Sequence, residues 1–133
     1  MLTETLRILV AEPIAASGVE LLRERFEVEV GEGWGSEELE ARIGGYDGIL
    51  IRSATRLTAE LIERADRLKV IGRAGIGVDN VDVAAATRRG IVVVNAPQSN
   101  VVAAAEHTLA LMLRRTRFTG HLVGEWSDHA MAA

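Results

Sequence analysis

The sequence predicts an α/β fold built on one parallel five-stranded sheet. Short runs of Ile, Leu and Val alternate with amphipathic stretches from Arg7 onward, which is typical of repeated βα units. Most of these runs are almost continuously apolar, as in strands that are buried on both faces of a sheet. Because crossovers between parallel strands are right-handed, five units most simply give a doubly wound sheet in the order 2-1-3-4-5, with helices on both faces.

The five strands are predicted from these apolar runs. All except the second are nearly continuous Ile, Leu and Val, so we expect them to be covered on both faces, whereas the second is less apolar. In chain order, the predicted strands are Arg7–Ala11, Phe26–Val30, Gly48–Ile51, Val70–Arg73 and Ile91–Val94.

The helices are predicted from the amphipathic stretches and from residues typical of helix ends. Ser36 precedes two glutamates and Thr58 precedes Glu60, which are patterns of a cap followed by an acidic first turn. Gly90 follows two arginines, as at a helix C-terminus. In chain order, the predicted helices are Ala15–Arg25, Ser36–Ile43, Thr58–Ala65, Val81–Arg88 and Asn100–Arg114.

Length and composition favour one small domain. The 133 residues can bury roughly two thirds of the unfolded surface, and we expect one domain at 1–117 with an irregular or helical tail at 118–133. No apolar run approaches the roughly 20 residues that span a bilayer, and no leader pattern is found, so we expect a cytoplasmic protein without a membrane partner. The net charge of -4 argues against nucleic acid as a partner, and the lack of cysteine excludes thiol chemistry.

Two arginines stand where predicted strands end. Arg52 follows the third strand and Arg73 ends the fourth, and these strands are neighbours in the predicted order. The carboxyl ends of parallel strands, about 4.8 Å apart, border the crevice where open α/β folds bind ligands. The loop Asn95–Asn100 comes from the next strand and leads into a helix N-terminus, which also favours anions. The pattern indicates a site for a small carboxylate or phosphate ester.

Each of these features also has an ordinary structural interpretation. The two arginines can form surface salt bridges, and Gly75 and Gly77 can serve turns with positive φ. The segment Asn95–Asn100 can be a strand-to-helix loop that ends in an N-cap. Both interpretations stay open at this stage, since a turn glycine also lets a ligand approach the backbone.

Three motifs carry a resemblance to a known family. They are Ile-Arg-Ser-Ala-Thr at 51–55, Gly-Arg-Ala-Gly-Ile-Gly-Val-Asp-Asn-Val-Asp at 72–82, and Asn-Ala-Pro-Gln-Ser-Asn at 95–100, running into Ala-Glu-His-Thr-Leu at 105–109. In these motifs, and over about 7–113, the chain resembles the D-isomer-specific 2-hydroxyacid dehydrogenases. The resemblance implies a flavodoxin-like domain that holds the substrate in a family of NAD-dependent oxidoreductases.

The resemblance also implies which residues face a substrate. Arg52 and Ser53 match positions near a phosphate, the loop 73–77 matches positions near a carboxylate, and Asn100 matches a position that lines the cleft. The implied partner is a small anion, a phosphorylated 2-hydroxy acid such as 3-phosphoglycerate. The candidate substrate-binding residues are Arg52, Ser53, Arg73, Ala74, Gly75, Ile76 and Asn100.

The chain departs from the family in its cofactor and catalytic residues. The family continues into a domain with Gly-x-Gly-x-x-Gly and a catalytic arginine, glutamate and histidine, whereas Gly72, Gly75 and Gly77 have the spacing G-x-x-G-x-G. We therefore expect no cofactor in this chain, although the full-length family uses NAD, and no catalytic residue. The sequence also departs after Leu113, apart from Gly-Glu-Trp at 124–126. The chain alone is predicted to be inactive as an enzyme.

The histidines do not indicate a catalytic or metal site. His107 follows Glu106 directly, and adjacent residues on a helix do not face each other, so we interpret His107 as packing. His121 and His129 lie in the tail at a spacing typical of no metal site. No histidine is placed to activate Ser53 as a nucleophile. We therefore expect no metal.

The fifth predicted helix is apolar on nearly all sides. Such a helix is buried on more than one side, and a small domain cannot cover it fully. The sequence therefore predicts that residues 100–117 either fold back over the sheet or are exchanged with a second copy, which gives a homodimer.

Four functions follow from these observations. They are a standalone substrate-binding domain, half of an enzyme that needs a separate nucleotide-binding domain, a signalling or electron-transfer domain of the same fold, and a dimerising scaffold without catalysis. Arg52 and Ser53 stand where a receiver domain has its phospho-accepting aspartate, and residues 12–14 lack the hydroxyl-rich phosphate loop of a flavodoxin. The third function is therefore disfavoured, and the first is preferred.

Overall fold

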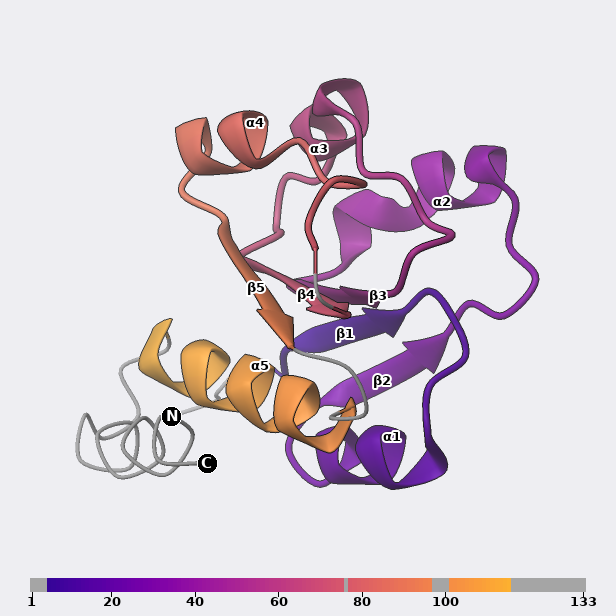
Figure 1. The fold of residues 1–133 in the computed structure, drawn as a ribbon, viewed down its shortest axis with the longest axis vertical. Helices are drawn as coiled ribbons and strands as arrows, with labels where there is room; N and C mark the ends of the chain where they lie inside the picture. The colour runs from indigo at the N-terminus through magenta and orange to yellow at the C-terminus, as the bar shows by residue number, and fades with distance from the viewer. Residues whose placement is uncertain (1–4, 76, 97–100, 116–133) are drawn as a thin grey trace.

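The computed structural model describes residues 5–75, 77–96 and 101–115. It has one parallel sheet in the order β2-β1-β3-β4-β5, as the sequence predicts (Figure 1). The strands are β1 Arg7–Val10, β2 Glu27–Val30, β3 Gly48–Ile51, β4 Val70–Ala74 and β5 Val92–Ala96. The helices are α1 Ala16–Arg23, α2 Ser36–Arg42, α3 Ala59–Arg64, α4 Val83–Arg88 and α5 Val101–Arg115, with a 3-10 turn, η1, at Ile43–Gly45.

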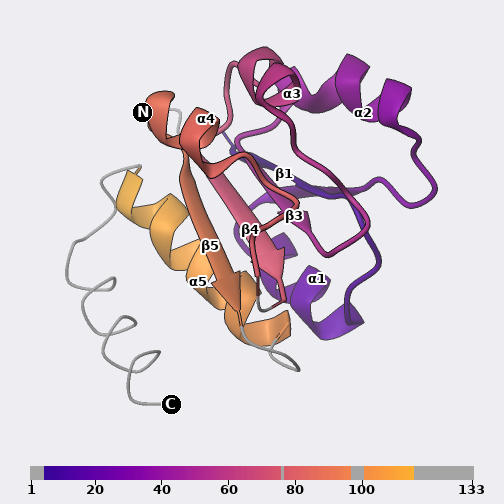
Figure 2. The same ribbon diagram turned by 45° about the horizontal axis from the view of Figure 1, so that its top comes forward.

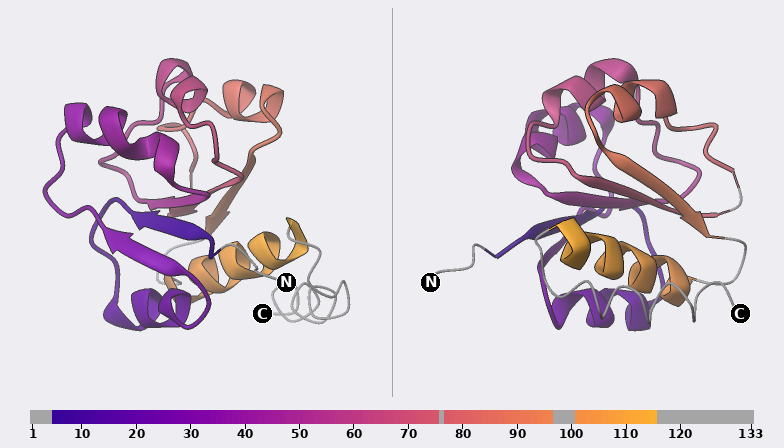
Figure 3. Two further views of the ribbon diagram at one scale, coloured as in Figure 1. Left: turned by 180° about the vertical axis from the view of Figure 1, so that it is seen from behind. Right: turned by 90° about the vertical axis from the view of Figure 1, so that its left-hand side faces the viewer.

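Helices cover both faces of the sheet. The two views of Figure 3 show α2, α3 and α4 on one face and α1 and α5 on the other. Along β3, Ile49 and Ile51 belong to the core beneath α2, α3 and α4, whereas Leu50 belongs to the core above α1 and α5. This alternation follows the pleat of a strand whose two faces are both buried.

The carboxyl ends of the central strands meet at one edge of the sheet. Ile51 of β3 lies opposite Arg73 of β4, and Arg73 lies opposite Asn95 of β5. Arg52 therefore leaves β3 one residue beyond the level of Arg73. The segments that carry the predicted site residues are thus adjacent in space, as the predicted strand order requires.

Helix α4 begins later than the sequence predicts. We expected it to begin at Val81, but Val81 forms a parallel bridge with Leu57. The carboxylate of Asp82 then accepts the backbone N–H of Ala85 at 2.9 Å and caps the helix, which begins at Val83. A backbone bridge between two loops therefore decides where α4 begins.

Two of the three predicted helix-end signals are confirmed. Thr58 caps α3 by accepting the N–H of Leu61 at 3.3 Å, and Gly90 has φ 70° just after α4. The expected cap at Ser36 is wrong, because Gly35 is the N-cap of α2 and no side chain accepts a hydrogen bond there.

Helix α5 packs on the sheet of its own chain. It lies against β4 and β5 and beside α1 (Figure 2). The described residues Ala105 and Met112 are fully buried. A glycine in β4 permits this approach, since a Cβ at Gly72 would lie 2.7 Å from Leu50 Cδ1 and 2.8 Å from Thr108 Oγ1. In this single chain α5 thus lies on its own sheet, and the choice between folding back and exchange with a second copy stays a prediction.

Several expectations lie outside what the structure tests. The tail 118–133 and the end of the fifth predicted helix at 116–117 are outside the described residues. A homodimer and a cytoplasmic location stay predictions. No helix in the described ranges is long and apolar enough to cross a membrane.

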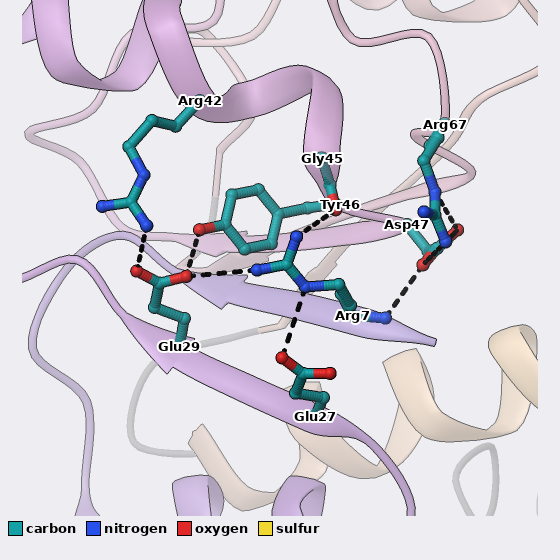
Figure 4. A network of polar contacts seen from close by, with 8 residues as sticks. All are labelled: Arg7, Glu27, Glu29, Arg42, Gly45, Tyr46, Asp47 and Arg67. Carbon is teal, nitrogen blue, oxygen red and sulfur yellow. Dashed lines mark hydrogen bonds and ion pairs between the residues drawn. The ribbon is translucent and has the colours of Figure 1, made fainter. Parts of the chain in front are cut away.

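A network of polar side chains fastens the edge strand β2 to α2 and η1 (Figure 4). Glu29 of β2 accepts hydrogen bonds from the Tyr46 hydroxyl and the Arg42 guanidinium. Arg7 of β1 lies 3.5 Å from the same carboxylate and donates to the carbonyl of Gly45 at 3.1 Å. Because β2 is an edge strand with one strand neighbour, these contacts supplement its backbone pairing with β1.

The network changes the titration of two of its members. Hydrogen bonding from the Tyr46 hydroxyl, assisted by Arg42 and Arg7, lowers the pKa of Glu29 below its ordinary value of 4.5. Burial of the phenol, with Glu29 close by, raises the pKa of Tyr46 to about 12. The ionised carboxylate and the neutral phenol are therefore the forms that stabilise the fold.

We expect Gly72→Ala to lower the free energy of unfolding by about 1–3 kcal/mol, because the new methyl group would overlap both Leu50 Cδ1 and Thr108 Oγ1. Chemical denaturation measures this loss. The control is Gly35→Ser, since a Cβ at Gly35 meets nothing within 4 Å and serine is a good N-cap. Equal stability of the Gly72 variant and the wild type would contradict the packing described for α5.

We expect Tyr46→Phe to lower the free energy of unfolding by about 1 kcal/mol near neutral pH, because Glu29 loses a hydrogen bond to its charged form. A carboxylate with a lowered folded-state pKa stabilises the fold above its unfolded pKa, and this stabilisation is lost as the pH falls through the folded-state pKa. Urea unfolding of both proteins between about pH 3 and 8 should show the difference narrowing below 4.5. A difference that is constant down to pH 3 contradicts this role of Glu29.

Candidate functional site

One buried carboxylate holds the loop that follows β3. Glu12 lies shortly after β1 and is 8% exposed. Its carboxylate accepts the backbone N–H groups of Arg52, Ala54 and Thr55, the last two at 3.0 and 3.1 Å. We call residues 52–55 the β3 loop. Hydrogen bonds to a charged acceptor are roughly twice as strong as neutral ones, so this carboxylate fixes three peptide planes of the β3 loop.

The Asn80 side chain binds two backbone carbonyl groups of the β3 loop. Its side-chain Nδ2 donates to the carbonyl oxygens of Arg52 at 2.7 Å and Thr55 at 2.6 Å, and Asn80 is 8% exposed. The backbone continues the link, because the Leu57 N–H donates to the Asn80 carbonyl at 2.8 Å and the Asp82 N–H donates to the Leu57 carbonyl at 2.9 Å. The loops that follow β3 and β4 are thus joined to each other.

The β3 loop presents two polar side chains to solvent. Arg52 and Ser53 are exposed. Within the described part of the chain, the acceptor found for the Arg52 guanidinium is the Pro13 carbonyl, 3.4 Å from Nη1. Since a guanidinium has five N–H donors, most of them stay available to an anionic ligand.

Arg73 is enclosed by its own loop. It is 9% exposed, and its guanidinium lies close beneath the turn, so that a Cβ at Gly75 would lie 2.6 Å from Nη1. Nη2 is 4.0 Å from Asp79, whose side chain is 91% exposed. Such a long, solvent-exposed ion pair satisfies this buried guanidinium only weakly.

Two buried side-chain atoms of this region have no hydrogen-bond partner in the described part of the chain. They are Arg73 Nε and Asn80 Oδ1. Buried polar atoms are nearly always paired, so two unpaired atoms within one loop region require a specific explanation. A polar ligand or ordered water at the carboxyl edge of β3 and β4 would supply the missing partners.

The structure brings most of the predicted site residues to one edge of the sheet. Arg52 and Ser53 lie in the loop after β3 and Gly75 in the turn after β4, while Arg73 and Ala74 are the last two residues of β4. The two arginines differ, because Arg52 is exposed whereas Arg73 is buried. Ile76 and Asn100 lie outside the described residues. That any of these residues binds a substrate stays a prediction.

The sequence analysis missed Glu12 and Asn80. Glu12 was considered there only as part of residues 12–14, which lack the phosphate loop of a flavodoxin, and was assigned no role in the site. An acidic residue just past a buried strand was the available signal for a carboxylate at the carboxyl edge of the sheet. Asn80 stands inside the motif Gly-Val-Asp-Asn-Val-Asp at 77–82, and its amide is the only carboxamide there. Pairing either residue with the β3 loop needs the three-dimensional structure.

A hollow borders the β3 loop on the side of α2. Its volume is about 380 Å³, and its lining includes Ala54 and Thr55 of the β3 loop together with Trp34 and Leu39. The Arg42 guanidinium lies 4.2 Å from the centre of the Trp34 ring, a cation–π contact that helps to fix this ring.

A second hollow, of about 590 Å³, lies at the opposite edge of the sheet. Its cationic residues are Arg67, Lys69 and Arg89. Asp47 pairs with Arg67 at 3.1 Å and with Lys69 at 3.6 Å, and Asp66 lies 3.7 Å from Arg89. These cations already have anionic partners, so this edge offers less to an anionic ligand than the β3 loop does.

The turn after β4 does not fit a dinucleotide. In a nucleotide-binding turn, glycines leave room for the pyrophosphate at the start of a helix. Here the Arg73 guanidinium occupies the space at Gly75, the Asp79 carboxylate lies 3.0 Å from a Cβ at Gly77, and α4 begins only at Val83. This turn thus does not fit NAD, and the described residues form no group of three or more His, Asp or Glu that could hold a metal. For the whole chain, the lack of both stays a prediction.

Comparison with known proteins finds one family over most of the chain. Residues 8–131 match the family model described as D-isomer specific 2-hydroxyacid dehydrogenase, catalytic domain. The expected departure from the family after Leu113 is therefore wrong, because the match continues to residue 131. D-3-phosphoglycerate dehydrogenase from Archaeoglobus fulgidus is 50% identical over 113 residues, which cover 84% of this chain and 21% of that protein. The protein of the same name from Synechocystis sp. is 47% identical over 111 residues, with 84% and 20% covered. The chain thus spans about a fifth of the length of these curated relatives.

Solved structures show the same fold. The TT0316 protein from Thermus thermophilus is 34% identical, with a TM-score of 0.65, and the match covers 96% of this chain and 41% of that one. The NAD+-bound 3-phosphoglycerate dehydrogenase from Entamoeba histolytica is 27% identical, with a TM-score of 0.61, over 84% of this chain and 38% of that one.

We expect Gly75→Ala to displace the Arg73 guanidinium and to lower the free energy of unfolding by about 1–3 kcal/mol, because the new methyl group would overlap Nη1. NMR detects the displacement as a shift of the Arg73 Nε–H resonance. The control is Gly35→Ala, because a Cβ at Gly35 meets nothing within 4 Å and should leave the Arg73 resonance in place. An unchanged resonance in the Gly75 variant would show that Arg73 does not lie beneath the turn.

Proposed function

The chain belongs to the family of D-isomer specific 2-hydroxyacid dehydrogenases, and from this premise we propose that it is a substrate-binding domain for a phosphorylated 2-hydroxy acid. The proposed substrate is 3-phosphoglycerate, after the relatives named D-3-phosphoglycerate dehydrogenase. The observation that carries the proposal is the exposed pair Arg52 and Ser53 on a loop fixed by Glu12 and Asn80. A rigid loop with a free guanidinium suits a small anion, because little ordering is needed on binding.

The two arginines would share the charge of the substrate. Arg52 is exposed and can form a bidentate contact with a phosphate. Arg73 lies one strand away, and its buried guanidinium would add positive potential from beneath the loop 75–79. Charge-assisted contacts of this kind contribute roughly 1.5–3 kcal/mol each. After the loss of translational freedom, two of them support a Kd in roughly the millimolar range.

Binding is the role proposed for this chain alone. We propose that the NAD-dependent oxidation of 3-phosphoglycerate, a step of serine biosynthesis, is not carried out by this chain alone. We propose that such chemistry occurs where this domain acts together with a nucleotide-binding domain, on the same chain or a separate one. The relatives support this division, since the chain covers about a fifth of their length. The chain of 133 residues is predicted to be inactive alone.

We expect saturable binding of 3-phosphoglycerate in an NMR titration, with Arg52→Ala at least about tenfold weaker because one charge-assisted contact is lost. Arg73→Ala should weaken binding as well and also destabilise the fold, since Arg73 is buried. The control is Arg25→Ala, an exposed arginine that precedes β2 at the other edge of the sheet. Titrations with D-glycerate and inorganic phosphate show which end of the ligand contributes the affinity.

The contrary result is a folded protein without saturable binding up to tens of millimolar. The domain would then act as a scaffold, or its site would need a second domain. Activity on mixing with a nucleotide-binding domain of a relative would distinguish these two cases.

A further inference from the structure

The β3 loop has four consecutive backbone N–H groups, and they are not used alike. Those of Arg52, Ala54 and Thr55 donate to the carboxylate of Glu12. No described residue accepts the N–H of Ser53, and Ser53 is exposed. The pattern leaves one backbone N–H donor next to the Arg52 guanidinium, most of whose N–H groups stay available.

Two backbone carbonyl groups of the β3 loop also accept hydrogen bonds from a buried side chain. Asn80 Nδ2 donates to the Arg52 and Thr55 carbonyls, at the two ends of the β3 loop. With three N–H groups and two carbonyls bound to buried side chains, the backbone of this loop cannot turn freely. Neither Glu12 nor Asn80 is exposed enough to serve as a main ligand contact, since each is 8% exposed.

We propose that Glu12 and Asn80 are positioning residues that hold the β3 loop so that the Ser53 N–H and the Arg52 guanidinium form one anion subsite. This inference rests on the proposed function and deepens it, because it assigns the anion to a backbone donor as well as to a side chain. The Ser53 N–H and the guanidinium would together receive the phosphate oxygens. The two positioning residues act through the backbone and do not touch the anion.

The charge of Glu12 allows the positioning role to be tested by the direction in which the affinity for an anion changes. A carboxylate beneath an anion site repels the ligand, so removal of its charge should tighten binding if charge alone matters. If Glu12 instead fixes the donors, its removal should weaken binding, because the competent loop conformation becomes less populated. The two accounts predict changes of opposite sign.

The experiment uses Glu12→Gln and Asn80→Ala in the 133-residue chain, with 3-phosphoglycerate as the probe. Glutamine keeps the size of the side chain but replaces one acceptor oxygen with a donor, which faces a backbone N–H. Asn80→Ala leaves the net charge unchanged. Each variant should bind at least about fivefold more weakly than the wild type.

A matched control separates positioning from loss of stability. Asp47→Asn removes another buried carboxylate, which accepts the backbone N–H of Arg7 at 2.8 Å at the opposite edge of the sheet. This variant loses the same charge and should lose stability, yet its affinity should stay within about twofold of the wild type.

Amide hydrogen exchange supplies a readout without ligand. In the wild type, the amides of Arg52, Ala54 and Thr55 should exchange at least about tenfold more slowly than that of Ser53. In Glu12→Gln, the three protected amides should exchange at least about tenfold faster, and Ser53 should change little.

The outcomes distinguish the inference from the proposed function. If the wild type binds and Glu12→Gln binds equally or more tightly, the positioning role is overturned while the proposed function stands. If the wild type does not bind, the proposed function fails, and the inference about an anion subsite fails with it. The exchange pattern then still decides whether Glu12 holds the loop, and equal exchange at all four amides overturns that part as well.

Discussion

The conformation of the loop after β3, at the carboxyl edge of the sheet, depends on one carboxylate. Glu12 accepts three backbone N–H groups of the β3 loop, so the course of that loop is set by a residue that precedes it by some 40 positions in the chain. Among the described residues, the Ser53 N–H is the one N–H of this loop that these contacts leave without an acceptor, and most N–H donors of the neighbouring Arg52 guanidinium stay available. A buried charge is costly unless it is fully hydrogen-bonded, and here the loop backbone supplies those bonds. The hydrogen bonds to Glu12 therefore both stabilise the β3 loop and leave the Ser53 N–H available as a donor.

The sheet provides the frame on which this contact can form. Parallel pairing puts the ends of β1, β3 and β4 at one edge, and these strands lead to Glu12, Arg52 and Arg73. Packing of α5 against Gly72 and of α2, α3 and α4 on the other face holds the strands in register. At the opposite edge, Asp47 already neutralises Arg67 and Lys69, so the carboxyl edge with Arg52 is the better place for an anion.

The sequence was sufficient for the sheet order, because continuous apolar runs and right-handed crossovers leave few alternatives. It was also sufficient for the place of Arg52 and Arg73, which follows from strand order alone. It did not predict that Arg73 is buried, since that depends on how closely the backbone at Gly75 approaches the guanidinium. Nor did it predict the start of α4, because the bridge between Leu57 and Val81 joins segments that are distant in sequence. Hydrogen bonds between distant loops leave no periodic pattern in a single sequence.

The most direct measurement of the central claim is a crystal structure of the chain with 3-phosphoglycerate bound. Our account predicts a phosphate or carboxylate oxygen within hydrogen-bond distance of the Ser53 backbone nitrogen and the Arg52 guanidinium, with Glu12 still bound to the three neighbouring N–H groups. A ligand seated instead among Arg67, Lys69 and Arg89 at the opposite edge of the sheet would contradict it.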